Sequence, residues 1–161
     1  MSDIAIMTDS NCGIMPGCEP CPDIHIIPMP VLIDGETFYE GKSITADSFY
    51  RQLASDAAVS TSLPSPGDVM DMWTSLLRDY REVVYIPMSS GLSTSCASAL
   101  ALASDGDFGG RVHVVDNHRI SVTQTQSVQD ACALAEEGKT GRQIKEQLER
   151  EALDASIYIA V

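Results

Sequence analysis

The chain alternates short runs of β-branched residues with helical patterns, and this alternation restricts its fold more than any other feature. Runs typical of buried strands cover residues 4–8, 24–27, 83–88 and 112–116. Helical patterns cover about 46–55, 66–80, 96–103 and 122–137, and a last helix begins after Thr140. Strands separated by helices usually pair in parallel, because the helix returns the chain to the same edge of the sheet. We therefore expect an α/β fold, a parallel-sheet Rossmann-like sandwich with helices on both faces.

A small β-hairpin is expected beside this sheet. Asp34-Gly35 separates Val31–Ile33 from Thr37–Tyr39, and an Asp-Gly pair between two β-prone runs is a strong hairpin signal. The sequence also predicts where two helices begin. Ser65 followed by Pro66 is an N-cap with proline at the first helical position, and Thr140 to Gln143 forms a capping box.

The sequence ends in Ser156–Val161, which has the composition of a further strand. A strand at the very end of a sequence either pairs with another strand of the same domain, or belongs to a chain that continues beyond it. We favour the second, and expect residues 1–161 to be a single domain that belongs to a longer chain.

Two loops rich in hydroxyl groups precede helices. The first is Ser60–Gly67, and the second is Ser89–Ser95, which joins a strand to a helix. Backbone N–H groups at a helix start lack intrahelical partners, so hydroxyls beside them suit a carboxylate or a phosphate. Ser65 is used as an N-cap, but Thr61 and Ser62 precede it and are available to a ligand. The alternative is that one serine caps each helix and the others only fill the loops.

Polar residues also follow the first strand, in the order Thr8-Asp9-Ser10-Asn11. Open parallel sheets bind ligands at the carboxyl ends of their strands, although an ordinary Asx turn explains this pattern equally well. His25 lies inside the second expected strand, and we interpret it as structural.

Charge and hydropathy exclude several classes of protein. The 161 residues include 23 acidic and 10 basic ones, for a net charge of −13 without a basic cluster, which argues against a nucleic-acid partner. No apolar run is long enough to span a membrane, and the N-terminus lacks the pattern of a signal peptide. We expect a cytoplasmic protein.

Five cysteines do not make a complete disulfide framework. Cys96 and Cys132 lie in alanine-rich helical patterns, and we interpret them as small core residues. Cys18 and Cys21 have the C-x-x-C spacing of redox and metal sites, and Cys12 would add a third ligand, with His25 as a fourth. This spacing is irregular for a structural metal site, so we expect neither a metal nor another cofactor.

Five stretches together resemble the amino-terminal half of the DegV family. In order along the chain they are Thr8–Ser10, Ile26–Val31, Thr61–Ser65, Ser89–Ser93 and Val112–Asp116. Each is short, but their order and spacing agree with the family over nearly the whole sequence.

The resemblance implies a lipid-binding protein, not an enzyme. DegV-like proteins hold a long-chain fatty acid, and some serve as the lipid-carrying subunit beside an ATP-binding fatty acid kinase. By position, Thr61 and Ser93 would hydrogen-bond the carboxyl group of the fatty acid, and Ser62 and Ser90 would assist.

The sequence departs from the family in three places. Thr94-Ser95 replaces the usual Gly-Thr, and Asn11-Cys12-Gly13 leads into a Cys/Pro-rich run instead of a helix-like stretch. The family also has a second domain that supplies a basic residue and a histidine to the carboxyl site. We expect the chain to be the amino-terminal part of such a two-domain protein.

Two other functions remain open. A serine acyl hydrolase would use Ser93 on the strand-to-helix turn, with Asp116 and His118 completing a triad. The nucleophile elbow needs a second glycine where this chain has Ser95, and Asp116 and His118 are awkwardly close in sequence. A general phosphate-binding α/β domain is the other alternative, supported only by the helix starts.

Overall fold

The computed structural model describes residues 3–161 except 16, 105, 157 and 159–161. Its centre is a four-stranded parallel sheet in the order β2-β1-β6-β7. The strands are β1 (Ile4–Asp9), β2 (Ile24–Ile27), β6 (Glu82–Ile86) and β7 (Val112–Val114). All four match predicted strands, although β6 and β7 each end two residues earlier than expected.

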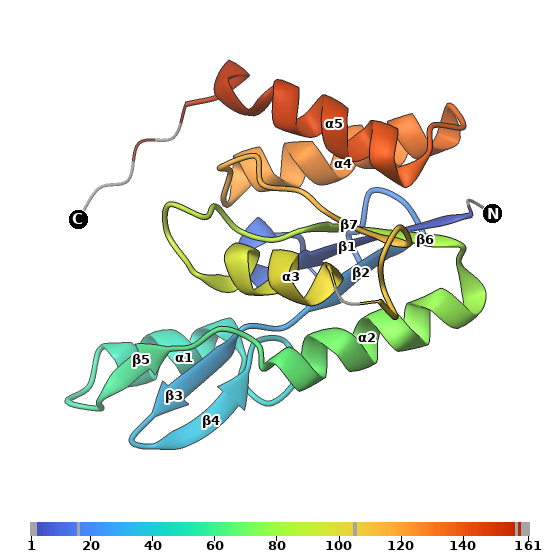
Figure 1. The fold of residues 1–161 in the computed structure, drawn as a ribbon. Coiled ribbons are helices and arrows are strands. Elements are labelled where there is room, and N and C mark those ends of the chain that lie inside the picture. The colour runs from blue at the N-terminus through green and yellow to red at the C-terminus, as the bar shows by residue number, and fades with distance from the viewer. Residues whose placement is uncertain (1–2, 16, 105, 157, 159–161) are drawn as a thin grey trace.

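Helices cover both faces of this sheet, as the strand–helix alternation predicted (Figure 1). One face carries α2 (Pro66–Asp79) and α3 (Ser95–Ala103), and the other carries α4 (Val122–Glu136) and α5 (Gly141–Arg150). On the α2 face, Trp73 is fully buried and meets the rings of Tyr85 and Phe108 edge-on, at centroid distances of 6.0 and 5.3 Å. Burial of three aromatic rings makes this face a rigid base for the loops at the end of the sheet.

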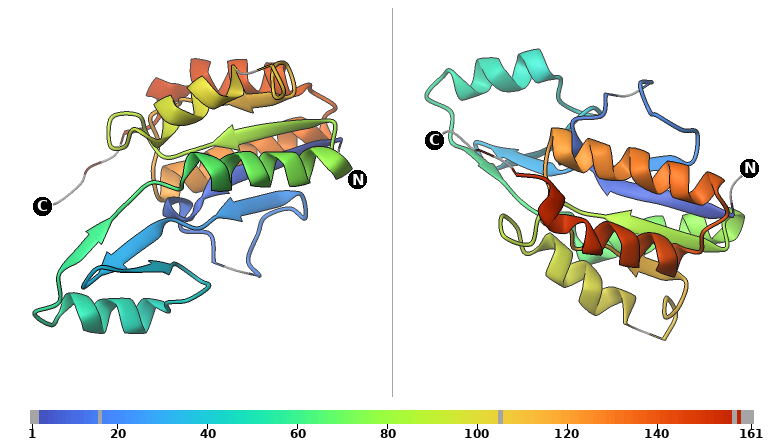
Figure 2. Two further views of the ribbon diagram at one scale, coloured as in Figure 1. Left: turned by 60° about the horizontal axis from the view of Figure 1, so that its bottom comes forward. Right: turned by 90° about the horizontal axis from the view of Figure 1, so that it is seen from above.

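A second, antiparallel sheet lies at one end of the molecule (Figures 1 and 2). Its strands are β3 (Pro30–Ile33), β4 (Glu36–Tyr39) and β5 (Val59–Thr61), and α1 (Ala46–Leu53) accompanies them. Asp34 and Gly35 have φ angles of 50° and 84°, the left-handed geometry of a type I′ hairpin turn, so the predicted hairpin is confirmed. Strand β5 was not expected, because its residues were assigned to a loop.

The helix starts predicted at Ser65 and Thr140 are confirmed, and Thr45 begins α1 in the same way. The hydroxyls of Thr45, Ser65 and Thr140 each accept a hydrogen bond from a backbone N–H in the first turn of the helix that follows. Two short 3₁₀ turns, η1 (Ser10–Cys12) and η2 (Ala152–Asp154), complete the described elements. Most of the strand expected over 156–161 lies outside the described residues.

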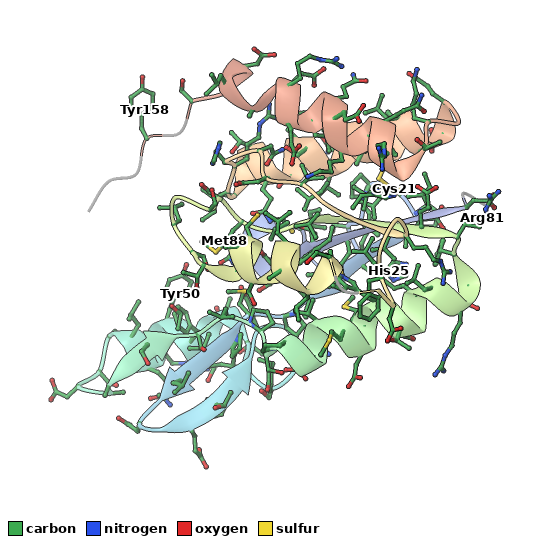
Figure 3. The ribbon with its side chains drawn as sticks, in the orientation of Figure 1. Cys21, His25, Tyr50, Arg81, Met88 and Tyr158 are labelled. Carbon is green, nitrogen blue, oxygen red and sulfur yellow. A yellow bond between two sulfur atoms is a disulfide. The ribbon has the colours of Figure 1, made fainter. Side chains whose placement is uncertain are left out.

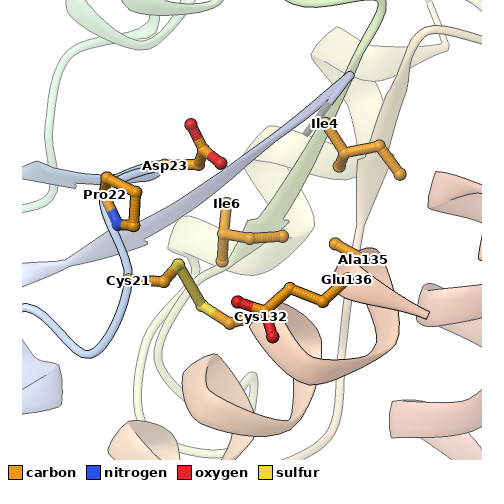
Figure 4. A pocket seen from close by; sticks show the side chains of 8 residues that line it. All are labelled: Ile4, Ile6, Cys21, Pro22, Asp23, Cys132, Ala135 and Glu136. Carbon is orange, nitrogen blue, oxygen red and sulfur yellow. A yellow bond between two sulfur atoms is a disulfide. The ribbon is translucent and has the colours of Figure 1, made fainter. Parts of the chain in front are cut away.

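A disulfide joins Cys21, in the loop after η1, to Cys132 on α4 (Figure 4). The two Cα atoms are 6.5 Å apart. The interpretation of Cys132 as only a core residue is therefore wrong, and Cys21 is not available to a metal. The sequence could not show this pair, because 111 residues separate its members.

Only Cys18 is expected to react with a disulfide reagent such as DTNB in the folded, oxidised protein. Cys18 is exposed, whereas Cys12 and Cys96 are buried free thiols. Burial raises the pKa of Cys12, and it raises the pKa of Cys96 to about 12, so neither forms the reactive thiolate at neutral pH. Thiol counting before and after denaturation without reductant tests this: one fast thiol per folded chain and three per denatured chain are expected. Three fast thiols in the folded chain would contradict the burial of Cys12 and Cys96, and five after denaturation would contradict the pairing of Cys21.

Gly141, the first residue of α5, is expected to tolerate no side chain. Its N–H donates to Oε2 of Glu82 at 2.6 Å, and a Cβ there would collide with that oxygen and with the ring of His113. Gly141→Ala should therefore lower the free energy of unfolding by about 2–3 kcal/mol, as overpacking does.

The matched control is Gly67→Ala, also in the first turn of a helix, where a Cβ would lie 3.7 Å from Oγ of Ser65. It should be neutral or stabilising by up to about 1 kcal/mol. Urea unfolding of both variants measures the difference, and equal stabilities would refute the packing argument.

No helix in the described part of the chain is both long and apolar enough to cross a lipid bilayer.

Candidate functional site

The carboxyl ends of β1 and β6 are joined by a buried carboxylate. Asp9 ends β1 and is completely buried. Its Oδ2 accepts a hydrogen bond from the Met88 N–H at 2.7 Å, and its Oδ1 accepts from the backbone and side-chain N–H groups of Asn11 at 3.1 and 3.0 Å. Nε2 of Gln124 also donates to Oδ1, at 3.2 Å. Asp9 therefore fixes the beginning of the loop that follows β6.

Gln124 extends this network from α4. Its Nε2 also lies within hydrogen-bonding distance of Oγ1 of Thr8 and of the carbonyl oxygen of Ile86, at 3.0 and 3.2 Å. Thr8 in turn donates to the same Ile86 oxygen at 2.8 Å. Sequence reasoning missed Gln124, although a signal existed: it shares the buried face of α4 with Val128 and Ala131, at helical spacing.

Burial raises the pKa of Asp9 above its ordinary value of 3.8, although hydrogen bonds from Met88, Asn11 and Gln124 oppose the shift. The folded protein therefore binds this proton more tightly than the unfolded chain does. The resulting stabilisation is fully present below pH 3.8 and is lost as the pH rises through the folded-state pKa.

Asp9→Asn removes this titration. We expect the stability of the variant, relative to the unchanged protein, to improve as the pH rises from below 3.8 toward neutrality. Urea unfolding of both proteins across that range measures the trend, and a constant difference would mean that Asp9 has no raised pKa.

The hydroxyl-rich loop after β6 is ordered by its own side chains. Oγ of Ser89 accepts from the Gly91 N–H at 3.2 Å, and Oγ of Ser93 accepts from the Ser95 N–H at 3.1 Å. The Ser93 oxygen is thus engaged at the start of α3, while its own hydrogen remains available to an acceptor. Oγ of Ser95 is buried and has no hydrogen bond within the described residues.

Thr61 and Ser62 lie at the end of β5. Thr61 pairs with Val31, and the Ser62 N–H donates to the carbonyl oxygen of Pro30 at 3.1 Å. Both side chains are exposed. The hydroxyl of Thr61 makes no hydrogen bond to the part of the chain that the structure describes, and that of Ser62 reaches only the carbonyl oxygen of Leu63, at 3.4 Å.

The structure brings the two loops to the same end of the molecule without direct contact between their hydroxyls. The Met29 N–H, next to Pro30, donates to Oγ of Ser10 at 3.0 Å, and Ser10 follows Asp9. This bond ties the small sheet to the carboxyl edge of the large one. Figure 3 shows Tyr50, on α1 beside the small sheet, at the same end as Met88. Among the described residues, no hydrogen bond joins Thr61 or Ser62 to Ser90 or Ser93.

A pocket of about 630 Å³ opens beside Ser10, with both apolar residues and charged ones, Glu19, Glu40 and Lys42, in its wall. Four isoleucines contribute to its wall: Ile14, Ile24, Ile26 and Ile44. None of the four hydroxyl residues predicted for the carboxyl site lines it. A smaller pocket of about 470 Å³ lies beside the Cys21–Cys132 disulfide, at residues including Ile4, Ile6 and Glu136 (Figure 4).

The serine hydrolase arrangement does not form around Ser93. Nδ1 of His118 lies 3.1 Å from Oγ of Ser90, and the same nitrogen lies 3.5 Å from Oδ1 of Asp116. A catalytic triad uses one ring nitrogen for the serine and the other for the carboxylate. Here both neighbours share Nδ1, so Asp116 does not support His118 as a base toward either serine.

His25 contacts Tyr80, not a cysteine. Its Nε2 is 3.4 Å from the Tyr80 hydroxyl, which donates to Oδ1 of Asp23 at 3.0 Å. Burial lowers the pKa of His25, which favours the neutral ring, and this geometry suits the structural role that was predicted.

A family model described as "Uncharacterised protein, DegV family" matches residues 3–161. This chain belongs to the DegV family. A DegV domain-containing protein of Deinococcus radiodurans is 31% identical over 159 residues, which are 98% of this chain and 56% of the relative. One of Staphylococcus aureus is 26% identical over 161 residues, which are 100% of this chain and 57% of the relative. The chain thus spans little more than half the length of these relatives.

Solved DegV structures have the same fold. A Thermus thermophilus DegV family protein, described by its fatty acid binding, has a TM-score of 0.81 at 28% identity, over 94% of this chain and 54% of its own. Bacillus subtilis DegV, described as a fatty acid binding protein, has a TM-score of 0.81 at 26% identity over the same shares. A stearic acid-binding protein of Eubacterium ventriosum has a TM-score of 0.78 at 26% identity, over 91% of this chain and 52% of its own.

Proposed function

We propose that this DegV domain binds a long-chain fatty acid and presents its carboxyl group to an ATP-dependent fatty acid kinase. In this proposal Thr61 and Ser93 donate hydrogen bonds to the carboxylate, and Ser62 and Ser90 assist them. The domain itself contributes binding and orientation, not catalysis. The observation that carries the proposal is the presence of two hydroxyl-bearing loops, one from each sheet, at one end of the molecule, in a fold shared with fatty-acid-binding DegV proteins.

The hydrogen-bonding state of the loops supports this assignment. A buried carboxylate needs several donors, because it loses its hydration on binding. Ser93 already accepts from the Ser95 N–H, so its hydrogen is available to a further acceptor, and the Thr61 hydroxyl has no partner among the described residues. Neither loop brings a full positive charge to the site, which leaves the carboxylate able to react with a phosphoryl group.

The pocket beside Ser10 supports binding of the hydrocarbon chain through its isoleucines. Its volume of about 630 Å³ is in the usual range for sites that hold a small organic molecule. Isoleucines from β2 and from the segments around it form the apolar part of its wall, which suits an acyl chain, while Glu19, Glu40 and Lys42 also line the pocket. The remainder of a full-length DegV protein would add further surface.

Lipid extraction and mass spectrometry of the intact protein test the proposal. We expect one long-chain fatty acid per protein, and phosphorylation of that acid when a fatty acid kinase and ATP are added. An intact protein that carries no fatty acid, and that takes up none when one is supplied, would refute the proposal. Calorimetric titration with inorganic phosphate is the control for the phosphate-binding alternative, and we expect no binding.

A further inference from the structure

Ser90, His118 and Asp116 form a polar cluster at the edge that carries the proposed carboxyl site. Ser90 belongs to the loop after β6, while Asp116 and His118 belong to the loop after β7, the neighbouring strand. Nδ1 of His118 is the shared centre, 3.1 Å from Oγ of Ser90 and 3.5 Å from Oδ1 of Asp116. His118 is a non-glycine residue with φ of 57°, so the fold holds its backbone in an uncommon conformation.

The Asp116 carboxylate favours one of the two neutral tautomers of His118. Oδ1 of Asp116 is buried and has no hydrogen bond within the described residues. An ionised carboxylate can only accept, so an N–H at Nδ1 is favourable beside it and a lone pair at Nδ1 is not. Asp116 therefore favours the neutral tautomer of His118 that carries its hydrogen on Nδ1.

Other charged groups around Asp116 do not reverse this preference. The Asp116 backbone N–H donates to Oε1 of Glu149, which is also paired with the Lys145 ammonium group. Burial raises the pKa of the Cys96 thiol, and the nearby Asp116 carboxylate raises it further. None of these groups faces Asp116 as a free cation in the described part of the chain.

The tautomer fixes the role of Ser90. With hydrogen on Nδ1, His118 donates to Oγ of Ser90, and the serine hydrogen is left for another acceptor. With hydrogen on Nε2 instead, Nδ1 would accept that serine hydrogen and withdraw it from the site. We propose that Asp116 and His118 are positioning residues that keep Ser90 a hydrogen-bond donor toward the carboxyl group of the bound fatty acid. This inference rests on the proposed function.

The tautomer can be measured without any ligand. Long-range ¹H–¹⁵N correlation spectra of the intact protein distinguish the two ring nitrogens, and His118→Asn identifies the signals. We expect the Nδ1–H tautomer in the unchanged protein. Asp116→Asn offers an N–H in place of a carboxylate oxygen, so it should shift His118 toward the Nε2–H tautomer. An Nε2–H tautomer in the unchanged protein would overturn the inference.

Fatty acid affinity provides the second readout. Asp116→Asn and Ser90→Ala should each weaken binding by about tenfold, the effect of losing one hydrogen bond to a charged group. In the Ser90→Ala background, Asp116→Asn should have no further effect. Equal weakening in both backgrounds would show that Asp116 acts on the structure and not through Ser90.

Two further variants complete the test. His118→Asn can keep an N–H near Ser90 and tolerates a positive φ, so it should retain affinity that His118→Ala loses. Asp107→Asn, at an exposed position, is the control for charge alone. Unchanged protein that binds no fatty acid would refute the proposed function as well, whereas normal binding without coupling between Ser90 and Asp116 would refute only this inference.

Discussion

The double variant Thr61→Ala, Ser93→Ala is expected to bind long-chain fatty acids at least about 100-fold more weakly than the unchanged protein. Each hydroxyl would donate one hydrogen bond to a carboxylate, and such a bond contributes about 1.5–3 kcal/mol. Fluorescence displacement or calorimetry on the intact protein measures the loss. The fold should be retained, because the exposed Thr61 side chain has no partner among the described residues and the loss at Ser93 is one hydrogen bond, from the Ser95 N–H at the start of α3.

The matched control for this variant is Thr74→Ala, Ser75→Ala. These neighbouring hydroxyls lie on the exposed side of α2 and have the same chemistry as the pair in the site. Their removal should leave fatty acid affinity unchanged. Equal affinity of the Thr61/Ser93 double variant and this control would mean that other groups bind the carboxylate. Single variants then separate the contribution of β5 from that of the loop after β6.

Asp9→Ala is expected to lower the free energy of unfolding by about 3–5 kcal/mol, a large part of the stability of an ordinary domain. The substitution removes the acceptor of the Met88 N–H, of two N–H groups of Asn11 and of Gln124, all near the end of the sheet. Each buried donor left without a partner costs about 1–3 kcal/mol. Urea unfolding of the variant measures the loss.

The control is Asp3→Ala, since Asp3 is exposed and its ion pair with Arg81 spans 3.6 Å at the surface. Its removal should change stability by less than about 1 kcal/mol. Asp9→Ala should also loosen the start of the loop after β6, where Asp9 accepts from the Met88 N–H. Hydrogen exchange at the Met88 and Gly91 amides reports this directly, and unchanged protection would contradict the role given to Asp9.

Features that depend on neighbours within four residues were predictable from the sequence. The N-caps at Ser65 and Thr140 and the turn at Asp34-Gly35 follow from hydrogen bonds and φ preferences that are local to each segment. The order of strands and helices was likewise sufficient to predict a parallel sheet with helices on both faces, because connections between parallel strands permit few topologies.

Features that depend on tertiary contacts were not predictable in the same way. β5 is three residues long and rich in hydroxyls, so nothing local distinguishes it from a loop; it is a strand because β3 offers it an edge. The network of Asp9 and Gln124 joins residues that are 115 positions apart. The hydroxyls assigned to the carboxyl group came from resemblance to a family, and their common role stays a prediction.

The covalent bond between Cys21 and Cys132 has a consequence for the unfolded chain. Closing a segment of 111 residues removes many conformations from the denatured ensemble, which in the chain-entropy description is worth about 4–5 kcal/mol. The folding equilibrium of this domain is therefore coupled to the thiol–disulfide balance of its surroundings. One and the same sequence should have two melting temperatures, and the midpoint of thermal denaturation should record whether the protein was last held under oxidising or reducing conditions.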